Sequence, residues 1–258
     1  MHFQDRDAFG RIVHLQPVRW VDDWPLMGED TNGDGIGEPV LRYRKPNIGA
    51  EAEFAVPDTS DTFESAKLGL QWQWQANPGE GWYSLEERPG YLRLYAAALP
   101  EGADTLYDAP QSLMQKFPAP SFTATTRLEL QPDGTEDEAG LIVFGDQYAY
   151  LSVSLDEDGR YTLRRVTGTK EGDSRAERTE ETAVLASGTV FLRVAVDEKA
   201  QCRFSCSTDG ANYEPIGPVF QAVEGRWVGA KVGLFTASRS GSVSRGYADF
   251  EAFLLEKS

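Results

Sequence analysis

The chain has little histidine, little cysteine and no long apolar run, and each shortage limits what it can be. Of its 258 residues, two are histidine and two are cysteine. No apolar run approaches the roughly 18 residues that a membrane-spanning helix needs. The first 20 residues also lack the basic start and apolar centre of a signal peptide. We therefore expect neither a membrane span nor a cleavable leader, the second only if Met1 is the biological start.

Positive charge is also scarce. The chain has 25 basic and 41 acidic residues, so its formal net charge is -16. Such a surface repels nucleic acids and anionic membranes, and a neutral partner such as a sugar suits it better. No phosphate-binding loop, Rossmann glycine pattern or zinc-spaced set of Cys and His is present. A serine hydrolase would need His2 or His14 as its base, and no Gly-x-Ser-x-Gly elbow accompanies either.

The two cysteines are expected to be free thiols. Cys202 and Cys206 lie four residues apart in a stretch with strand character. Four residues of strand span roughly 13 Å, and a disulfide tolerates a Cα separation of only roughly 7 Å. Free thiols favour a reducing cytoplasm without deciding between a cytoplasmic and a secreted protein.

Period-2 alternation and turn clusters dominate what remains, and almost no helical periodicity is present. Candidate strands cover Gly69–Trp74, Tyr91–Tyr95, Phe122–Leu130, Gly140–Phe144, Ala149–Ser154, Tyr161–Val166, Val190–Val196, Gln201–Ser207, Ala230–Phe235 and Gly246–Leu255. Short strands at near-regular spacing predict an all-β sandwich or barrel. The highly charged stretch 170–182 is predicted to be a solvated loop, with a short helix as the alternative.

The first 46 residues have a different character. Strands at 11–16 and 18–21 are predicted to form a hairpin, followed by a Gly- and Asp-rich loop and a linker at 44–47. A lone hairpin of this size is marginal in water. We therefore divide the chain into a segment 1–46 and a sandwich 47–258. The segment is expected to pack on the sandwich or to pair with a second copy of the chain, giving a homo-oligomer.

One loop in this segment carries a possible metal site. The stretch from Asp30 to Gly35 reads D-x-N-x-D-G, the first half of a calcium loop. The twelfth position is Leu41 rather than a bidentate Glu, and Asp, Asn and Gly also form ordinary turns. Calcium binding and a plain loop both stay open. The candidate ligands are Asp30, Asn32, Asp34, Glu38 and His14, the last being equally consistent with a packed, hydrogen-bonded side chain.

Aromatic residues are concentrated near the start of the predicted sandwich. Trp72 and Trp74 are two residues apart and so share one face of a strand. An exposed pair would form a platform on which sugar rings stack. The alternative is core packing, because tryptophan carries a large area to bury.

A set of motifs is spread over nearly the whole chain: HisPheGlnAsp (2–5), GlyArgIleValHisLeuGlnProVal (10–18), GlyAspGlyIleGlyGluProVal (33–40), ValProAspThrSerAsp (56–61), LeuGlyLeuGlnTrpGlnTrp (68–74), ArgProGlyTyrLeuArgLeu (88–94), LeuMetGlnLysPhe (113–117), GlyArgTrpValGlyAlaLysValGlyLeuPhe (225–235) and GlyTyrAlaAspPhe (246–250). Together they resemble the C-terminal part of family 43 glycoside hydrolases of the β-xylosidase and α-L-arabinofuranosidase type. The first three resemble the last blade of a five-bladed propeller. The others resemble an appended concanavalin A-like jelly-roll sandwich.

The resemblance implies glycoside hydrolysis, but with the catalytic residues outside this sequence. The family hydrolyses O-glycosyl bonds with inversion, using two separated carboxylates, which in the family lie upstream of anything that matches Met1. Met1 is then expected to be an internal methionine exposed by truncation. Arg11 resembles an arginine that hydrogen-bonds the substrate, and His14 a position near the propeller axis. The loop after Phe235 resembles one that reaches the pocket, so Phe235, Trp72 and Trp74 join Arg11 as candidate substrate-binding residues.

Three functions therefore stay open. The first is the C-terminal portion of a glycosidase acting on xylose- and arabinose-containing hemicellulose, which supplies structural and pocket-closing elements. The second is a carbohydrate-binding sandwich without catalysis. The third is a purely structural partner that supports a propeller and has no activity of its own. Either of the first two would bind a xylo- or arabino-oligosaccharide, and whether the chain alone is an enzyme is left undecided.

Overall fold

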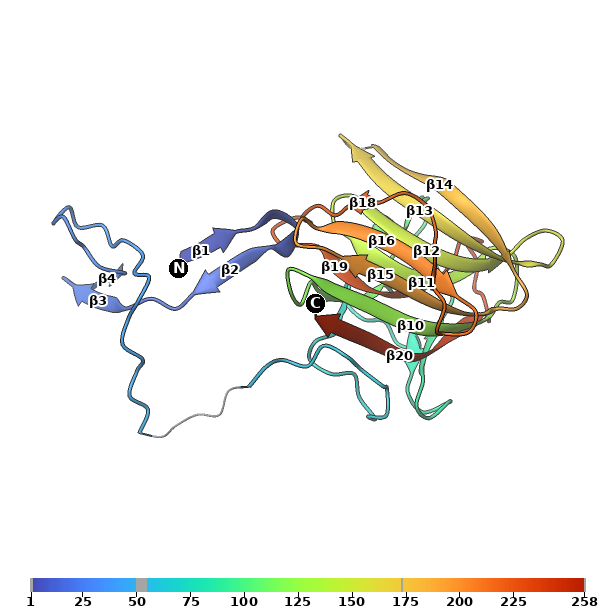
Figure 1. The fold of residues 1–258 in the computed structure, drawn as a ribbon, viewed down its shortest axis with the longest axis horizontal. Helices are drawn as coiled ribbons and strands as arrows, with labels where there is room; N and C mark the ends of the chain where they lie inside the picture. The colour runs from blue at the N-terminus through green and yellow to red at the C-terminus, as the bar shows by residue number, and fades with distance from the viewer. Residues whose placement is uncertain (1, 50–54, 173, 258) are drawn as a thin grey trace.

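The computed structural model describes residues 2–49, 55–172 and 174–257. Within them the chain forms two large sheets packed face to face as a sandwich, with two small hairpins projecting from one end (Figure 1). None of the described helices is long and apolar enough to cross a membrane. The all-β class expected from the alternation is confirmed.

Sheet one has the order β17-β16-β15-β10-β20-β7-β6, with β18 paired to β16. Its strands are β6 Tyr83–Ser84, β7 Leu92–Tyr95, β10 Phe122–Gln131, β15 Thr189–Val196, β16 Gln201–Ser207, β17 Glu214–Pro215, β18 Phe220–Gln221 and β20 Tyr247–Lys257. In β10 and β15 every second residue is buried, and these inward side chains form the layer between the sheets. Burial of one Leu or Val contributes about 1.5–3 kcal/mol, so this layer is the main source of stability.

Sheet two has the order β14-β13-β12-β11-β19-β9-β5, with β8 paired to β19. Its strands are β5 Gln73–Trp74, β8 Ala97–Ala98, β9 Leu113–Lys116, β11 Asp137–Phe144, β12 Tyr148–Leu155, β13 Tyr161–Glu171, β14 Ser174–Leu185 and β19 Lys231–Ser238. Unlike sheet one, it is covered on its outer face, where residues of 99–109, with the short 3-10 helix η2 (Leu106–Asp108), form a second apolar cluster with Ile142, Tyr150 and Phe235. Strands β11 and β12 are therefore buried on both faces.

The ten predicted strands all appear, most of them with shifted ends, but the charged stretch 170–182 was predicted wrongly. It contains most of β14, which pairs with β13 from Tyr161↔Leu185 to Glu171↔Ser174. Strand β14 lies at the edge of its sheet and has hardly any apolar face, so alternation gave no signal. Charged edge strands are a common protection against pairing with another chain.

The predicted pairing of the N-terminal strands was also wrong. Strand β2 (Arg11–His14) pairs with β1 (His2–Asp5), and β3 (Val18–Val21) pairs with β4 (Trp24–Met27). The second hairpin closes on two residues with positive φ, Asp22 and Asp23, as a tight two-residue turn requires. Two hairpins therefore replace the predicted one.

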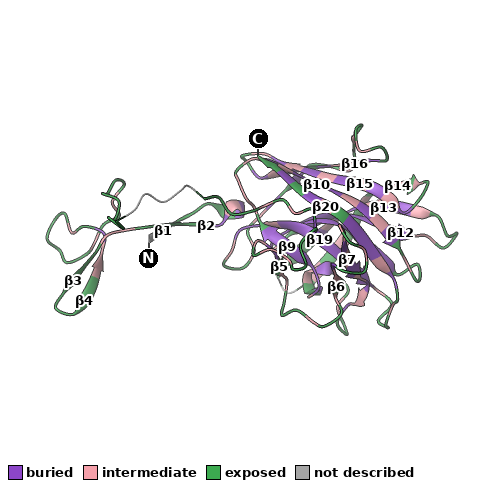
Figure 2. Ribbon diagram, turned by 90° about the horizontal axis from the view of Figure 1, so that it is seen from below, coloured by how far each residue is buried: buried purple, intermediate pink, exposed green. Residues whose placement is uncertain are grey.

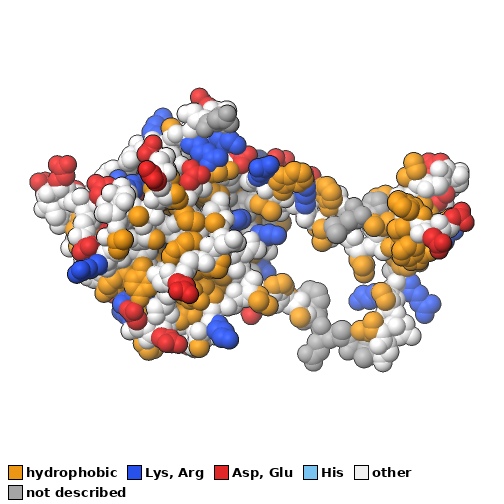
Figure 3. All heavy atoms as spheres, turned by 180° about the vertical axis from the view of Figure 1, so that it is seen from behind, with side chains coloured by type: hydrophobic (Ala, Val, Ile, Leu, Met, Phe, Trp, Pro, Cys, Tyr) orange, Lys and Arg blue, Asp and Glu red, His pale blue; other side chains and the backbone are white. Residues whose placement is uncertain are grey.

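The two hairpins, called the N-terminal arm below (residues 2–27), touch the sandwich mainly through the 3-10 turn η1 (Asp7–Phe9). Ala8 is buried, its carbonyl oxygen accepts a 2.7 Å hydrogen bond from the Ala230 N–H, and Phe9 packs on Phe117. The strands of the arm are mostly exposed while the sandwich interior is buried (Figure 2). Apolar side chains gather on the far part of the arm in Figure 3. The exposed large apolar residues of β3 and β4 are Val18, Trp20, Val21 and Trp24.

Candidate functional site

The arm and the sandwich bring two conspicuous side chains together. Arg11 begins β2, and its guanidinium carbon lies 5.6 Å from the centre of the Trp227 ring and 4.9 Å from that of Phe3. Its Nε donates to Asp5 at 3.4 Å. Trp227 comes from the turn before β19 and is 72% exposed. We call this place, lined by Asp5, Asp7, Arg11, Glu224 and Trp227, the junction site.

The backbone conformation that exposes Trp227 is energetically unfavourable. Its φ is 69°, a left-handed conformation that disfavours a bulky residue by about 1–3 kcal/mol. A hydrogen bond from the Gly225 N–H to the Val228 carbonyl closes the turn around it at 2.9 Å. Strain of this kind is concentrated at binding and catalytic sites. A large, exposed apolar ring on a strained backbone indicates that Trp227 belongs to a binding surface.

Close backbone packing fixes the two halves of the junction site. A Cβ added to Gly229 would lie 2.5 Å from the Gly10 nitrogen, so only glycine fits there. Gly10 precedes Arg11 directly, and Gly229 follows Trp227 by two residues. The position of Arg11 relative to Trp227 is therefore set by backbone contact rather than by long flexible side chains.

The chemistry offered by the junction site is binding chemistry. The small hollow between the two parts has a volume of about 50 Å³ and is lined by three carboxylates and one guanidinium. An exposed indole face can stack on the C–H face of a sugar, and Arg and carboxylate groups can bond its hydroxyls. The hollow is too small to hold a sugar by itself, so the junction site can form only one wall of a larger pocket.

The other predicted substrate residues lie elsewhere. Phe235 is fully buried under the 99–109 segment, where its ring meets Tyr150 edge to face. The loop after it begins at the far end of β19, about 25 Å of strand from Trp227. The loop at 239–246 and Arg11 therefore cannot line one small pocket in this structure.

Trp72 and Trp74 do not form an exposed pair. Trp72 is buried between Phe63 and Phe253, and its Nε1 donates to Asp61 at 2.8 Å. Trp74 is partly buried and packs against Trp82 and Tyr83. Only the last residues of the predicted strand 69–74 are extended, so the two rings have different surroundings. Core packing, the alternative weighed for this pair, describes Trp72.

The predicted metal ligands are engaged in turn hydrogen bonds. Asp30 accepts from the N–H groups of Gly33 at 2.6 Å and Gly35 at 3.0 Å, and Asp34 accepts from Ile36 at 2.8 Å. Glu38 accepts from the Thr31 hydroxyl at 3.0 Å, and Asn32 bonds Asp34. His14 is exposed on β2. The described residues contain no group of three acidic, His or Cys side chains arranged for a metal ion, and calcium at this loop stays a prediction.

Trp227 was quoted in a motif but not singled out from the sequence. The available signal was an aromatic residue between glycines, in GlyArgTrpValGlyAla, where no alternating strand had begun. A large apolar ring outside every predicted strand and flanked by glycines could have marked it. The free thiols were predicted correctly, since neither Cys202 nor Cys206 forms a disulfide.

The sandwich matches a known family. The sequence profile of the β-xylosidase C-terminal concanavalin A-like domain covers residues 60–256. The chain belongs to this family. The resemblance read from the motifs is confirmed, as is the concanavalin A-like fold.

Individual relatives extend the match to the N-terminal arm. A β-xylosidase from Formosa agariphila is 33% identical over 96% of this chain, and a non-reducing end α-L-arabinofuranosidase from Bacteroides ovatus is 28% identical over 95%. The crystal structure of a xylan β-1,4-xylosidase from Bacillus halodurans superposes with a TM-score of 0.75 at 26% identity, over 97% of this chain and 48% of that one. The matched part is 43% of the Formosa protein and 44% of the Bacteroides protein, so this chain spans less than half the length of these relatives and corresponds to their C-terminal part.

Proposed function

We propose that this chain is the C-terminal portion of a glycosidase that hydrolyses xylose- or arabinose-containing hemicellulose, and that its junction site forms one wall of the sugar pocket. The observation that carries this proposal is Trp227, exposed in a strained backbone conformation beside Arg11. The relatives named above, which the chain matches over nearly its whole length, support the reaction class.

The role of the junction site is to bind and enclose. The Trp227 ring covers an apolar sugar face, and Arg11 donates to hydroxyls from a position held by Asp5. Inverting hydrolysis needs an acid and a base on opposite sides of the bond. We assign both to the part of such enzymes that this chain does not match. The junction site then contributes through orientation and exclusion of water, which raise the rate only when the two carboxylates are present.

The N-terminal arm is the surface on which the rest of such an enzyme packs. Among the described residues, β1 pairs with β2 and β3 pairs with β4 in separate two-stranded sheets, so all four are edge strands. Val18, Trp20 and Trp24 are 49–76% exposed. Unpaired strand edges and apolar patches both favour association with further β-strands. The preferred partner is the propeller portion, and a second copy of this chain is the alternative, giving the homo-oligomer considered from the sequence.

The test joins this chain to the part of the Formosa β-xylosidase that it does not match. Hydrolysis of 4-nitrophenyl β-D-xylopyranoside and α-L-arabinofuranoside is measured for the fusion and for the chain alone, and folding of both is checked by circular dichroism. The proposal predicts turnover by the fusion and none above a buffer blank by the chain alone. Turnover by the chain alone, or a folded fusion without activity, would contradict it.

A further inference from the structure

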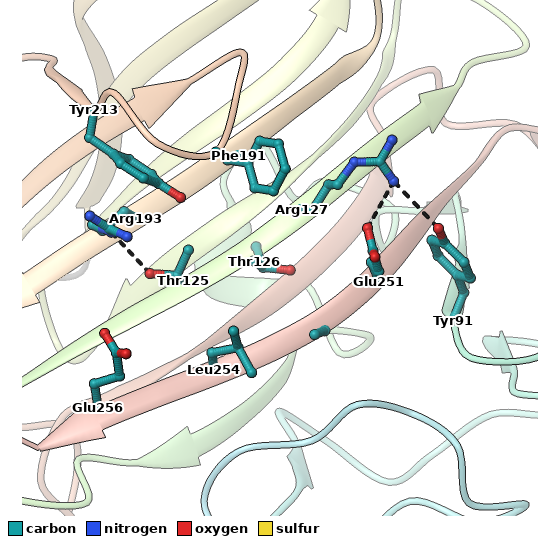
Figure 4. Close-up of a pocket in the computed structure, with 12 residues that line it drawn as sticks. Tyr91, Thr125, Thr126, Arg127, Phe191, Arg193, Tyr213, Glu251, Leu254 and Glu256 are labelled. Carbon is teal, nitrogen blue, oxygen red and sulfur yellow. Dashed lines mark hydrogen bonds and ion pairs between the residues drawn. The ribbon is translucent and has the colours of Figure 1, made fainter.

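The outer faces of the two sheets differ in how far the chain covers them. That of sheet two is covered by the chain itself, through the 99–109 segment. On sheet one a groove of about 610 Å³ stays open across β10, β15 and β20 (Figure 4). This volume falls within the roughly 300–1,000 Å³ typical of small-ligand sites. We call it the outer groove, and none of its lining residues belongs to the junction site.

The floor of the outer groove is apolar and its margins are polar. Leu254, which pairs with Thr125 across the strands, is 44% exposed there and lies beside Ala252. Phe191 stands above this floor, with its ring held against Gly210, where a Cβ would come within 2.9 Å of the ring. Tyr213, Phe191 and Tyr91 follow one another along the groove in Figure 4. A row of rings over an apolar floor suits an extended ligand with flat, weakly polar faces.

The charged groups at the margins balance one another. Arg127 donates to Glu129 at 2.5 Å, outside the groove lining, and to the lining residues Glu251 at 3.0 Å and Tyr91 at 3.4 Å. Arg193 donates to Thr125 at 3.0 Å, and its guanidinium carbon lies 3.4 Å from the centre of the Tyr213 ring. Glu256 lines the groove near the same end as Arg193. Two cations face two carboxylates, so the groove offers no net charge to an ionic ligand, and the overall charge of -16 disfavours anions further. Fixed donors and acceptors around an apolar floor match a neutral polyhydroxylated chain.

We propose that the outer groove binds a neutral, linear β-linked pentose oligosaccharide and so gives the protein a second sugar-binding site, away from the junction site. The choice of pentose rests on the proposed function, whereas the groove itself does not. Phe191, together with the face of Tyr213 that Arg193 leaves uncovered, stacks on sugar rings above Leu254. Arg193 and Arg127 present hydrogen-bond donors to the hydroxyls. Such a site would hold the polymer while its end is processed elsewhere.

The experiment is isothermal titration of xylohexaose into the 258-residue chain and four variants, each checked by circular dichroism and thermal melting. Phe191→Ala with Tyr213→Ala removes two rings, and Leu254→Glu places a charge on the exposed floor without disturbing the core. The expected result is binding that weakens at least tenfold in both. Tyr83→Ala removes an exposed ring outside both the outer groove and the junction site, so it is the matched control and should change the affinity less than twofold. Trp227→Ala reports separately on the junction site.

Two results would overturn the inference. One is the absence of xylohexaose binding to the wild-type chain. The other is binding that Trp227→Ala abolishes while Leu254→Glu and the double variant leave it unchanged, which would assign all sugar binding to the junction site. That second result would contradict the outer-groove site but not the proposed function. An inactive fusion enzyme whose outer groove still binds xylohexaose would contradict the proposed function but not the outer-groove site.

Discussion

Arg239 is the cation of a mostly buried cluster of acidic groups in the sandwich, so its removal should be costly. Its guanidinium donates to Glu138 at 2.5 Å, to Glu177 at 2.7 Å and to the Tyr150 hydroxyl at 3.0 Å. The Glu138 side chain is 1% exposed and that of Arg239 is 23% exposed. Burial opposes the charge on Arg239, but the neighbouring acidic groups outweigh it and raise the pKa of this arginine far above its usual value.

Arg239→Met should therefore destabilise the protein by about 3 kcal/mol, because two carboxylates lose their main cation in a mostly buried place and typical losses are about 3–5 kcal/mol. We take the lower end because Arg164 still donates to Glu138 at 3.0 Å and two tyrosines to Glu177. A domain of this size then melts about 6–12 °C lower.

The assay is urea unfolding followed by tryptophan fluorescence, with thermal melting as a second measure. The pKa of Arg239 is raised, so its stabilising contribution is fully present below the unfolded-state pKa and disappears only as pH rises through the higher folded-state pKa. The destabilisation caused by Arg239→Met should therefore be the same at every pH between 6 and 9. Arg160→Met is the matched control, since Arg160 also bonds two carboxylates but is 59% exposed, and exposed pairs contribute about 0–1 kcal/mol. A loss below 1 kcal/mol for Arg239→Met would refute the reasoning.

Three further outcomes are expected. Arg165 is fully buried, and among the described residues its guanidinium donates to oxygens of Val166, Thr167 and Pro218 but to no carboxylate. Burial lowers its pKa to about 10, so its charge destabilises the fold at pH 7 and the penalty fades as pH rises above 10. Arg165→Met should raise the free energy of unfolding in urea at pH 7 by about 1–3 kcal/mol, and a decrease of more than 1 kcal/mol would contradict this. If calcium binds the 30–38 loop, calcium should raise the melting temperature, EDTA should reverse the rise and Asp34→Ala should abolish it; a chain indifferent to EDTA has an ordinary turn there. The N-terminal arm should cause the chain alone to self-associate, so light scattering should detect oligomers. The double variant Trp20→Lys with Trp24→Lys should be a monomer. A monomeric wild-type chain would contradict the prediction that the arm mediates association.

Alternation identified the sandwich because many of its strands are buried on one face only. Strands such as β10 and β15 carry every second residue into the core, and their periodicity was visible at once. Strand β14 escaped because its burial comes from pairing with β13 and not from an apolar face. The local sequence pattern also could not show that β2 pairs with the preceding strand β1 rather than with the following strand β3. His2–Asp5 is too short to show a period.

The candidate site was less accessible from the sequence than the fold. Arg11 came from resemblance, and nothing local to it indicates that Trp227, more than 200 residues later, lies 5.6 Å away. The contact depends on two glycines, Gly10 and Gly229, that allow the backbones to touch. The aromatic pair Trp72 and Trp74 drew attention for its spacing, yet the tertiary structure places Trp72 in the core and bonds it to Asp61.

The central claim is that the junction site forms part of the sugar pocket, and Trp227→Ala in the fusion enzyme tests it most directly. The measurement is kcat/KM on 4-nitrophenyl β-D-xylopyranoside, beside Tyr83→Ala, which removes another exposed ring outside the junction site. The claim predicts at least a tenfold loss for Trp227→Ala with unchanged melting temperature, and less than a twofold change for Tyr83→Ala. Equal activity of the two variants and the parent fusion would contradict it.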